Sequence, residues 1–309
     1  MRLVFMGTPE FALPTLRILC NSRHEIVCVV TRPDRPKGRG QRPTGSEVKK
    51  EALKFNLPVL QPENLKDLEF IQTLRNYHAD CFIVVAFRIL PPEVFTLPPR
   101  GTVNLHASLL PKYRGAAPIQ WALIRGEQET GVSVFFIEKE VDVGELILQE
   151  QVQIQENENA GDLHDKLSKV GADAVLKAMD LIEKGNVERF PQKGEPTSAP
   201  KILPEHCRIQ WDQSPDQIVN LIRGLSPFPG AFTLIGEKRL KIFKAQIVTN
   251  NSHEHGLPGE IVGIQKEGFV VSVKNGSVLI TEIQLAGKQR MEVEAFLRGY
   301  SLVAGTVLN

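Results

Sequence analysis

The sequence has few of the features that mark secreted, metal-binding or membrane proteins. Its 309 residues include four cysteines with no Cys-x-x-Cys pair, and three of the four lie inside apolar segments. This pattern is typical of buried thiols, so we expect neither a disulfide nor a bound metal. No apolar run approaches the roughly 18 to 20 residues of a membrane span, and a strand pattern begins at Arg2, which leaves no room for a signal peptide. We expect a cytoplasmic protein with no membrane partner.

An excess of one charge sign is also missing. The chain has 37 Lys and Arg against 36 Asp and Glu, a formal net charge of +1. A protein that binds nucleic acid over its whole surface would be more basic, so any basic surface must be local. The pattern shows no large exposed apolar repeat that needs a partner, and we expect a monomer. The length predicts about two domains.

The first 180 residues alternate between short apolar runs and amphipathic stretches. Strands are predicted at residues 2–6, 25–30, 58–61, 81–86, 102–108 and 131–137, and a long helix over residues 159–183 follows them. This alternation predicts an α/β domain built on a doubly wound, mostly parallel, Rossmann-like sheet. In such folds ligands bind at the carboxyl ends of the strands.

The composition changes between Gly185 and Pro204, where Pro, Lys, Gly and Ser are frequent. This segment reads as a linker, and we expect a catalytic domain over residues 1–189, a linker over 190–207 and a second domain over 208–309. The second domain opens with a helix that Ser214 caps. Five short strands with turn signals then predict a small β-barrel of the oligonucleotide-binding (OB) type.

Two polar residues stand two apart in the strand TVNLHAS, residues 102–108. Side chains at i and i+2 of a strand share a face, so Asn104 and His106 are expected side by side at the carboxyl end of the sheet. Asp142 follows the next strand and is expected at the same edge, where a carboxylate would orient the histidine. The trio suits acyl transfer without a nucleophilic Ser or Cys. Spacing alone leaves open a structural histidine and a capping aspartate.

The strand of Asn104 is followed by the apolar turn Ser108-Leu109-Leu110-Pro111. An apolar rim of this kind suits a heteroaromatic cofactor, although an ordinary βα loop has the same composition. The turn after the first strand, Gly7-Thr8-Pro9-Glu10, lacks the three glycines of a dinucleotide fingerprint, so binding of NAD has weak support.

The strongest local charge lies in residues 32–50, where seven basic and two acidic residues give a net charge of +5 in 19 residues. Its Pro and Gly residues predict a long irregular loop at the same edge as Asn104. Such a loop suits binding of phosphates; the alternative is a solvated insert without a partner.

Several motifs resemble those of the methionyl-tRNA formyltransferase family over essentially the whole chain. They are MGTPEFA, TRPDRPKGRG, NLHASLLPKYRGAAPIQWAL, VDVGELI and SPFPGAFT. The Asn-x-His-x-Ser-Leu-Leu-Pro core with a later Asp-x-Gly is shared by enzymes that take a formyl group from 10-formyltetrahydrofolate. The resemblance implies transfer of that group to the free α-amino group of methionine on initiator tRNA, for translation initiation.

The resemblance also implies roles for individual residues. Asn104, His106 and Asp142 would be catalytic, and the basic insert would contact the acceptor end of the tRNA through Lys37, Arg39 and Arg42. The folate would be flanked by Ser108, Leu109, Leu110, Pro111 and Phe87. The chain departs from the family in the turn AFRILP, residues 86–91, which is one residue shorter than the AYGxILP of many members.

Two other functions fit part of this pattern. A folate-dependent formyltransferase that acts on a nucleotide-linked amino sugar would use the same trio but would not need the basic insert. An inactive RNA-binding module would use the insert and the barrel without any chemistry.

Overall fold

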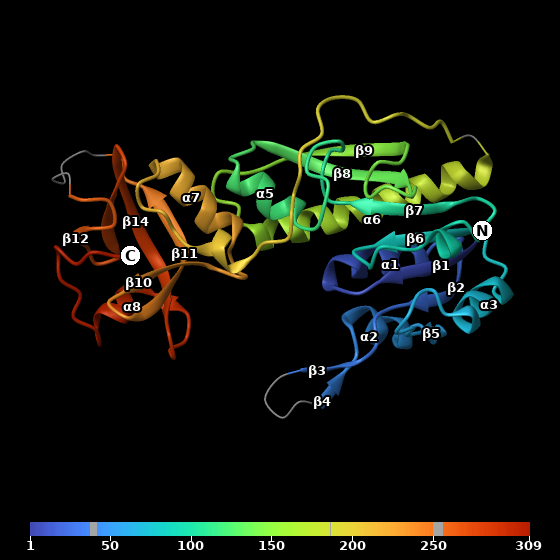
Figure 1. Cartoon of the computed structure of the whole chain (residues 1–309), viewed down its shortest axis with the longest axis horizontal. Coiled ribbons are helices and arrows are strands. Elements are labelled where there is room, and N and C mark those ends of the chain that lie inside the picture. The colour runs from blue at the N-terminus through green and yellow to red at the C-terminus, as the bar shows by residue number, and fades with distance from the viewer. Residues whose placement is uncertain (38–41, 186, 250–255) are drawn as a thin grey trace. The chain divides into compact units, whose positions relative to one another are not determined.

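The computed structural model describes residues 1–37, 42–185, 187–249 and 256–309 (Figure 1). The chain forms two compact units that interleave along the sequence. The first unit contains residues 1–115, 129–153 and 164–199, and the second contains residues 116–128, 154–163 and 200–309. The domain boundaries predicted from composition stay a prediction.

The first unit is built on a seven-stranded sheet with the order β5-β2-β1-β6-β7-β8-β9. Neighbours from β5 to β7 pair in parallel, whereas β8 pairs antiparallel with both β7 and β9, which confirms the predicted mostly parallel sheet. The edge strand β9 was not predicted. The strands are β1 (Arg2–Gly7), β2 (Glu25–Val30), β5 (Val59–Leu60), β6 (Cys81–Val85), β7 (Thr102–His106), β8 (Glu129–Phe136) and β9 (Leu146–Gln153).

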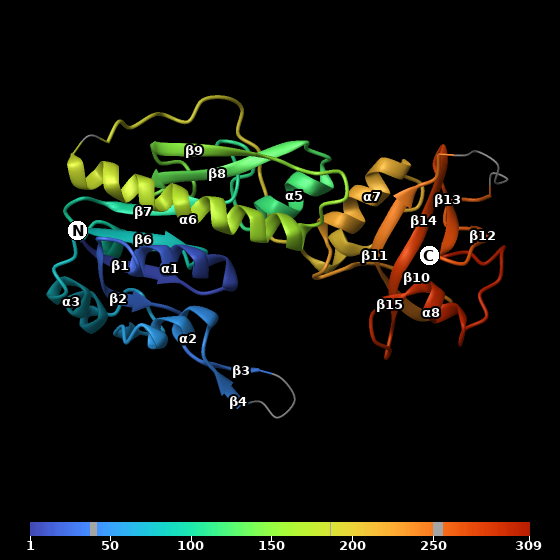
Figure 2. The same cartoon turned by 180° about the vertical axis from the view of Figure 1, so that it is seen from behind.

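Helices and short helical turns cover this sheet. The longest, α6, lies along one face of it (Figure 2), and a Cβ atom added at Gly171 would lie 2.7 Å from Cδ2 of Leu105 on β7. The absence of a side chain at this position therefore allows the helix to approach the strand closely. The elements are η1 (Glu10–Ala12), α1 (Leu13–Cys20), α2 (Glu47–Lys54), α3 (Leu68–Asn76), α4 (Pro92–Phe95) and α6 (Ala160–Lys184), whose first four residues belong to the second unit.

The basic insert contains regular structure, so the expectation of an irregular loop was wrong. β3 (Arg35–Lys37) and β4 (Arg42–Thr44) form an antiparallel pair. Pro36 stands opposite Pro43. The pairs on either side of them, Arg35 with Thr44 and Lys37 with Arg42, consist of residues that carry a main-chain N–H. Proline is compatible with a two-stranded ribbon of this kind, because each strand has an edge that needs no hydrogen-bond donor.

The second unit is an antiparallel sheet with the order β10-β11-β14-β13-β12. The last residues of the chain close it, since Asn309 exchanges hydrogen bonds with Leu234 of β10 while Ile261 of β12 donates to Thr306. This arrangement agrees with the predicted small barrel. Its strands are β10 (Ala231–Ile235), β11 (Lys238–Ile247), β12 (Ile261–Ile264), β13 (Phe269–Val273), β14 (Gly276–Leu285) and β15 (Met291–Glu292).

Short helices accompany this sheet, and the predicted capping of one of them is confirmed. The Ser214 hydroxyl accepts a hydrogen bond from the Gln217 main chain, and the Gln217 side chain accepts one from the Ser214 main chain, a capping box. The elements are α5 (Pro118–Ile124), η2 (Pro204–Cys207), α7 (Pro215–Gly224) and α8 (Val293–Leu297). Among the described residues, no helix is long and apolar enough to cross a membrane.

Candidate active site

Asn104 and His106 lie in β7 as the sequence predicts, with His106 as the last residue of the strand. Asn104 is half-buried, and His106 is 6% exposed. Asn104 is paired with Val84 of β6 on one side and with Phe135 of β8 on the other, and His106 is paired with Ser133 of β8. A small apolar cluster in the same unit consists of Leu110, Phe135 and Leu146. The pair therefore lies on an interior strand of the sheet, and Phe135 of this cluster stands opposite Asn104.

The two nitrogens of the His106 ring have different partners. Nε2 lies 2.8 Å from the main-chain oxygen of Tyr113. A carbonyl oxygen accepts only, so Nε2 carries a proton whether the ring is neutral or charged. Nδ1 faces the Asp142 carboxylate, with 3.7 Å between Nδ1 and Oδ2. The atom of His106 that can gain or lose a proton is consequently Nδ1.

Asp142 is fixed from the main chain rather than by the histidine. Its Oδ2 accepts a hydrogen bond of 2.9 Å from the Gly115 N–H, and its side chain is 10% exposed. The residue itself has a φ of +57°, an uncommon conformation for a residue other than glycine. A Cβ atom added at the nearby Gly144 would collide with the main-chain oxygen of Phe136. The carboxylate is thus placed by a tight turn that tolerates little change.

The Asn104 side chain completes the predicted trio. Its position two residues before His106 places both side chains on one face of β7. Within the described parts of the chain the Asn104 amide makes no hydrogen bond. Its N–H groups are therefore available to a ligand.

The predicted cofactor turn is only partly accessible. Ser108, Leu110 and Pro111 are buried, and the Ser108 hydroxyl donates to the main-chain oxygen of Lys112 over 2.6 Å. The Leu110 main chain donates to Ser133 Oγ and accepts from Gln149. Of these four predicted residues, Leu109 alone is half-buried. The turn can present one apolar side chain and a fixed backbone shape to a ligand.

Phe87 lies in the shortened turn after β6. It is half-buried, the guanidinium of Arg88 lies 5.2 Å from its ring centre, and Ile89 is 76% exposed. Arg88 donates to the main-chain oxygens of Pro62 and Glu63, which fixes the turn to a neighbouring segment. Apolar surface is therefore exposed here despite the missing residue.

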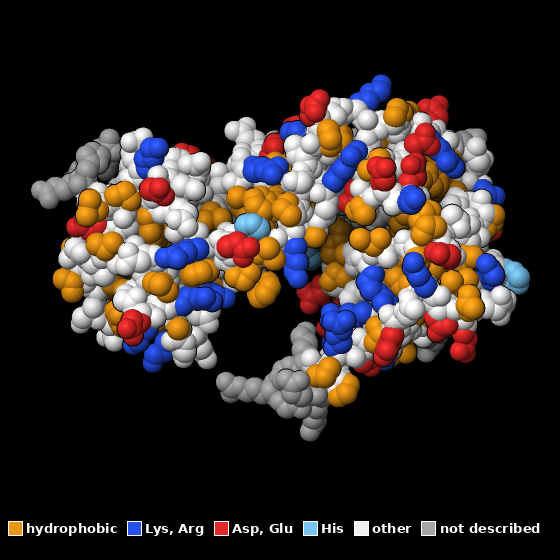
Figure 3. Space-filling view, in the orientation of Figure 1, with side chains coloured by type: hydrophobic (Ala, Val, Ile, Leu, Met, Phe, Trp, Pro, Cys, Tyr) orange, Lys and Arg blue, Asp and Glu red, His pale blue; other side chains and the backbone are white. Residues whose placement is uncertain are grey.

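Two of the three basic residues predicted to bind tRNA end the described part of the β3–β4 hairpin. The main chains of Lys37 and Arg42 stand opposite each other as the last described pair, and Arg39 lies outside the described residues. Figure 3 shows Lys and Arg side chains gathered on the surface near the base of this hairpin. Lys49 is already paired with Asp34, with 2.7 Å between Nζ and Oδ2, so it adds little free charge.

Three contributors to the site were missed from the sequence: the Tyr113 carbonyl, the Gly115 N–H and the Gln192 side chain. The Gln192 amide donates to the main-chain oxygens of Asp142 and Gly144. Two of the three contributors are main-chain groups, which every residue type carries, and the third lies 50 residues beyond Asp142. No residue type or local spacing indicated them.

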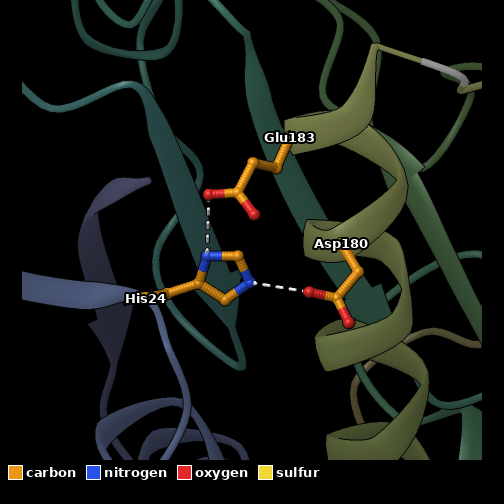
Figure 4. A group of neighbouring side chains, drawn as sticks. All are labelled: His24, Asp180 and Glu183. Carbon is orange, nitrogen blue, oxygen red and sulfur yellow. Dashed lines mark hydrogen bonds and ion pairs between the residues drawn. The ribbon is translucent and has the colours of Figure 1, made fainter.

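A second cluster of polar side chains lies apart from these residues and consists of His24, Asp180 and Glu183 (Figure 4). Its carboxylates already have cationic partners. Arg23 Nη2 lies 2.7 Å from Asp180 and 2.9 Å from Glu183, and the N-terminal ammonium of Met1 lies 2.8 Å from Glu183. Burial lowers the pKa of His24, and the ammonium lowers it further. We assign the cluster to an ion-pair network that ties α6 to the start of the sheet.

Comparison with known proteins identifies the family. The profile of the formyl transferase family matches residues 1–179, and that of the formyl transferase C-terminal domain matches residues 201–301. A protein of Moorella thermoacetica named methionyl-tRNA formyltransferase is 46% identical over 100% of this chain and 99% of its own. The chain belongs to the methionyl-tRNA formyltransferase family. Another family member, from Pelotomaculum thermopropionicum, is 44% identical over 100% of this chain and 98% of its own.

Solved structures share the fold of this formyltransferase at lower identity. HypX from Aquifex aeolicus in complex with tetrahydrofolic acid has a TM-score of 0.64 at 20% identity, and the match covers 97% of this chain and 47% of HypX. An N-formyltransferase from Helicobacter canadensis, in complex with folinic acid and dTDP-3-aminofucose, has a TM-score of 0.65 at 20% identity over 94% of this chain and 99% of its own. At this identity the likeness concerns the fold.

Proposed function

We infer that this protein transfers a formyl group from 10-formyltetrahydrofolate to the α-amino group of methionine on initiator tRNA. The observation that carries this conclusion is the full-length identity of 44 to 46% to proteins named methionyl-tRNA formyltransferase. The short distance between His106, the last residue of β7, and Asp142, between β8 and β9, supports this part of the sheet edge as the site of the chemistry.

We propose that Asn104, His106 and Asp142 carry the reaction. When the methionine amine attacks the formyl carbon, negative charge develops on the carbonyl oxygen. The Asn104 amide and the protonated Nδ1 of His106 stabilise that charge as hydrogen-bond donors. Asp142, 3.7 Å from Nδ1, stabilises the positive charge of the ring. After the attack the amine loses a proton and the folate nitrogen takes one as the bond to the formyl carbon breaks, so no covalent intermediate with the protein is needed.

For the formyl donor we propose an apolar contact surface built from Phe87 and Leu109. Both side chains are half-buried, so each has surface left for a heteroaromatic ring. Ser108, Leu110 and Pro111 contribute the rigid shape of the turn, because their side chains are buried. The donor is a co-substrate that is consumed, and the chemistry requires no metal.

For the tRNA we propose contacts from the basic hairpin through Lys37, Arg39 and Arg42, and from residues 208–309. This follows the predicted division into a catalytic domain of residues 1–189, a linker of residues 190–207 and a tRNA-binding domain. In the barrel some basic side chains have internal partners: the Lys241 ammonium donates to the Pro229 oxygen over 2.7 Å, and Arg290 pairs with Glu282. The hairpin is therefore a stronger candidate than the barrel for binding the phosphates of the tRNA.

The direct test measures transfer of labelled formyl from 10-formyltetrahydrofolate to methionine-charged initiator tRNA, with uncharged tRNA as the control. Label should appear only on the charged tRNA. Transfer to a nucleotide-linked amino sugar instead, together with full activity after deletion of residues 35–42, would support the amino-sugar function. Binding of tRNA without any transfer would support an inactive RNA-binding module.

A further inference from the structure

The segment of residues 190–199, here named the strap, follows α6 without forming a helix or a regular strand (Figure 1). It nevertheless belongs to the first unit. Its first contact is with β9, where Phe190 exchanges two main-chain hydrogen bonds with Leu146, at 2.8 and 2.9 Å. The strap is therefore fixed to the sheet four residues after Asp142.

The other end of the strap is bonded to the loop that carries Tyr113. The Tyr113 N–H donates to Thr197 Oγ1 over 2.9 Å, and the Arg114 N–H donates to the Thr197 oxygen over the same distance. The Ala199 N–H donates to the Arg114 oxygen over 2.7 Å. A Cβ atom added at Gly115 would lie only 2.6 Å from the Ala199 oxygen. The two main-chain groups that contact His106 and Asp142 are thus held by the strap.

Between these ends, the Gln192 side chain joins the two loops. Its Nε2 donates to the Asp142 and Gly144 oxygens, at 2.9 and 3.0 Å. Its Oε1 accepts from Arg114 Nη2 at 2.6 Å and from Arg114 Nε at 3.2 Å. Both polar atoms of the amide are occupied, and they link the loop of Asp142 to the loop of Tyr113 and Gly115. An aspartate or a lysine could not supply a donor and an acceptor in the same place.

We propose that the strap is part of the active site and that Gln192 and Thr197 are positioning residues for Asp142 and His106. The strap touches neither reacting atom. It holds the Gly115 N–H against the Asp142 carboxylate and the Tyr113 oxygen against His106 Nε2, so its loss displaces the ion pair. A displacement of about 1 Å at reacting groups can lower a rate by about 100-fold. The proposal rests on formyl transfer as the proposed function.

The main test is a double-mutant cycle with Gln192→Ala and Asp142→Asn, measured as formyl transfer. Gln192→Ala should lower kcat about 10- to 100-fold with little change in KM for the tRNA. In the Asp142→Asn background the same substitution should cost less than about threefold, because the carboxylate that Gln192 is proposed to position is already absent. Equal costs in the two backgrounds, or a wild-type rate in Gln192→Ala, would overturn the proposal. A wild-type protein without formyl transfer would instead overturn the proposed function.

Conservative variants separate positioning from general stability. Thr197→Ser retains the hydroxyl that accepts from Tyr113 and should keep kcat near wild type, whereas Thr197→Val loses that acceptor and should lower kcat. Gln72→Ala is the matched control, since Gln72 is an exposed glutamine on α3 whose amide bonds to Asn76. It should leave kcat unchanged. Equal rates in Thr197→Ser and Thr197→Val would count against the proposed role of Thr197.

Hydrogen exchange tests the same geometry without any substrate. The Gly115 amide donates to Asp142, so it should exchange more slowly in the wild type than in Gln192→Ala and as slowly in Gln72→Ala as in the wild type. Unchanged exchange at Gly115 in Gln192→Ala would show that Gln192 does not position the pair.

Discussion

The Nε2 atom of His106 lies 2.8 Å from the main-chain oxygen of Tyr113, and this contact assigns a separate task to each ring nitrogen. Nε2 anchors the ring, and Nδ1, which faces Asp142, is the atom proposed to act in the reaction. A glutamine can place an N–H close to the position of Nε2 but cannot take up a proton. The structural and the chemical roles of the histidine can therefore be separated by substitution.

His106→Gln is expected to keep the bond to Tyr113 and to lose the ring nitrogen that faces Asp142. Turnover should fall by at least about 100-fold, while thermal stability and folate binding stay near wild type. His106→Ala should lose the anchor as well and be the less stable of the two. Steady-state kinetics, thermal unfolding and folate titration measure these effects. Turnover of His106→Gln near the wild-type level would exclude Nδ1 from the reaction.

Asp142→Asn keeps an oxygen that can accept from Gly115 but removes the charge beside Nδ1. We expect turnover to fall by about 100-fold or more with nearly unchanged folate affinity. Asp173→Asn, which changes an exposed carboxylate on α6, is the matched control and should have wild-type turnover. The two variants carry the same change in net charge, so a difference between them reports the position of the carboxylate.

The ion pairs of Glu51 predict that the folded protein loses stability in acid. Its carboxylate lies 2.6 Å from Arg17 Nε and 2.8 Å from Lys54 Nζ, and these bonds lower the pKa of Glu51 to about 2. A carboxyl group whose pKa is depressed on folding stabilises the protein above its usual pKa, and this contribution is lost as the pH falls from about 4.5 toward 2.

Glu51→Gln should therefore lower the free energy of unfolding by about 1 to 3 kcal/mol at neutral pH, and the difference from the wild type should shrink in acid. Denaturant unfolding at several pH values measures both effects. Glu188→Gln, at an exposed position, is the control and should have no measurable effect. A constant difference between Glu51→Gln and the wild type down to pH 2 would contradict the prediction.

The burial of His24 predicts a second effect of pH on stability, at higher pH than that of Glu51. Burial lowers its pKa in the folded protein below the usual 6.5, so the unfolded chain binds the proton first as the pH falls. Stability should decrease from about pH 6.5 downward, by at most about 1.4 kcal/mol per pH unit. His24→Gln should lack this part of the pH dependence. If the wild type and the variant respond alike between pH 7 and 5, the histidine is not its source.

The basic hairpin predicts salt-sensitive binding of tRNA. Lys37→Ala or Arg42→Ala should weaken binding and reduce the slope of the logarithm of the binding constant against the logarithm of salt concentration, by about one for each phosphate that the side chain neutralises. Binding titrations at several salt concentrations measure the slope. Lys66→Ala, at an exposed lysine after β5, is the control. An unchanged slope in both hairpin variants would remove the hairpin from the interface.

The sequence predicts the fold and the proposed catalytic trio for identifiable reasons. Apolar runs alternate with amphipathic stretches up to α6, and the period of two along β7 brings Asn104 and His106 to one face. The β3–β4 hairpin was not predicted because its prolines and glycines are typical of irregular loops. The strap lies in the segment predicted as a linker, because Pro, Lys, Gly and Ser are frequent there. Its contacts with the rest of the unit mostly use main-chain groups. Main-chain contacts cannot be recognised from residue type or spacing.

The position of the strap in the chain also bears on how the protein is made. A ribosome completes both loops of the site well before it reaches Gln192, which follows Asp142 by 50 residues. A nascent chain that ends at residue 189 would already contain Asn104, His106 and Asp142 without the bonds that hold them in register. On the proposed role of the strap, full activity should therefore appear only after residues 190–199 have left the exit tunnel. Truncated products of early termination would contain the proposed catalytic residues without the strap, and on the proposed role of the strap they should turn over more slowly than the full chain.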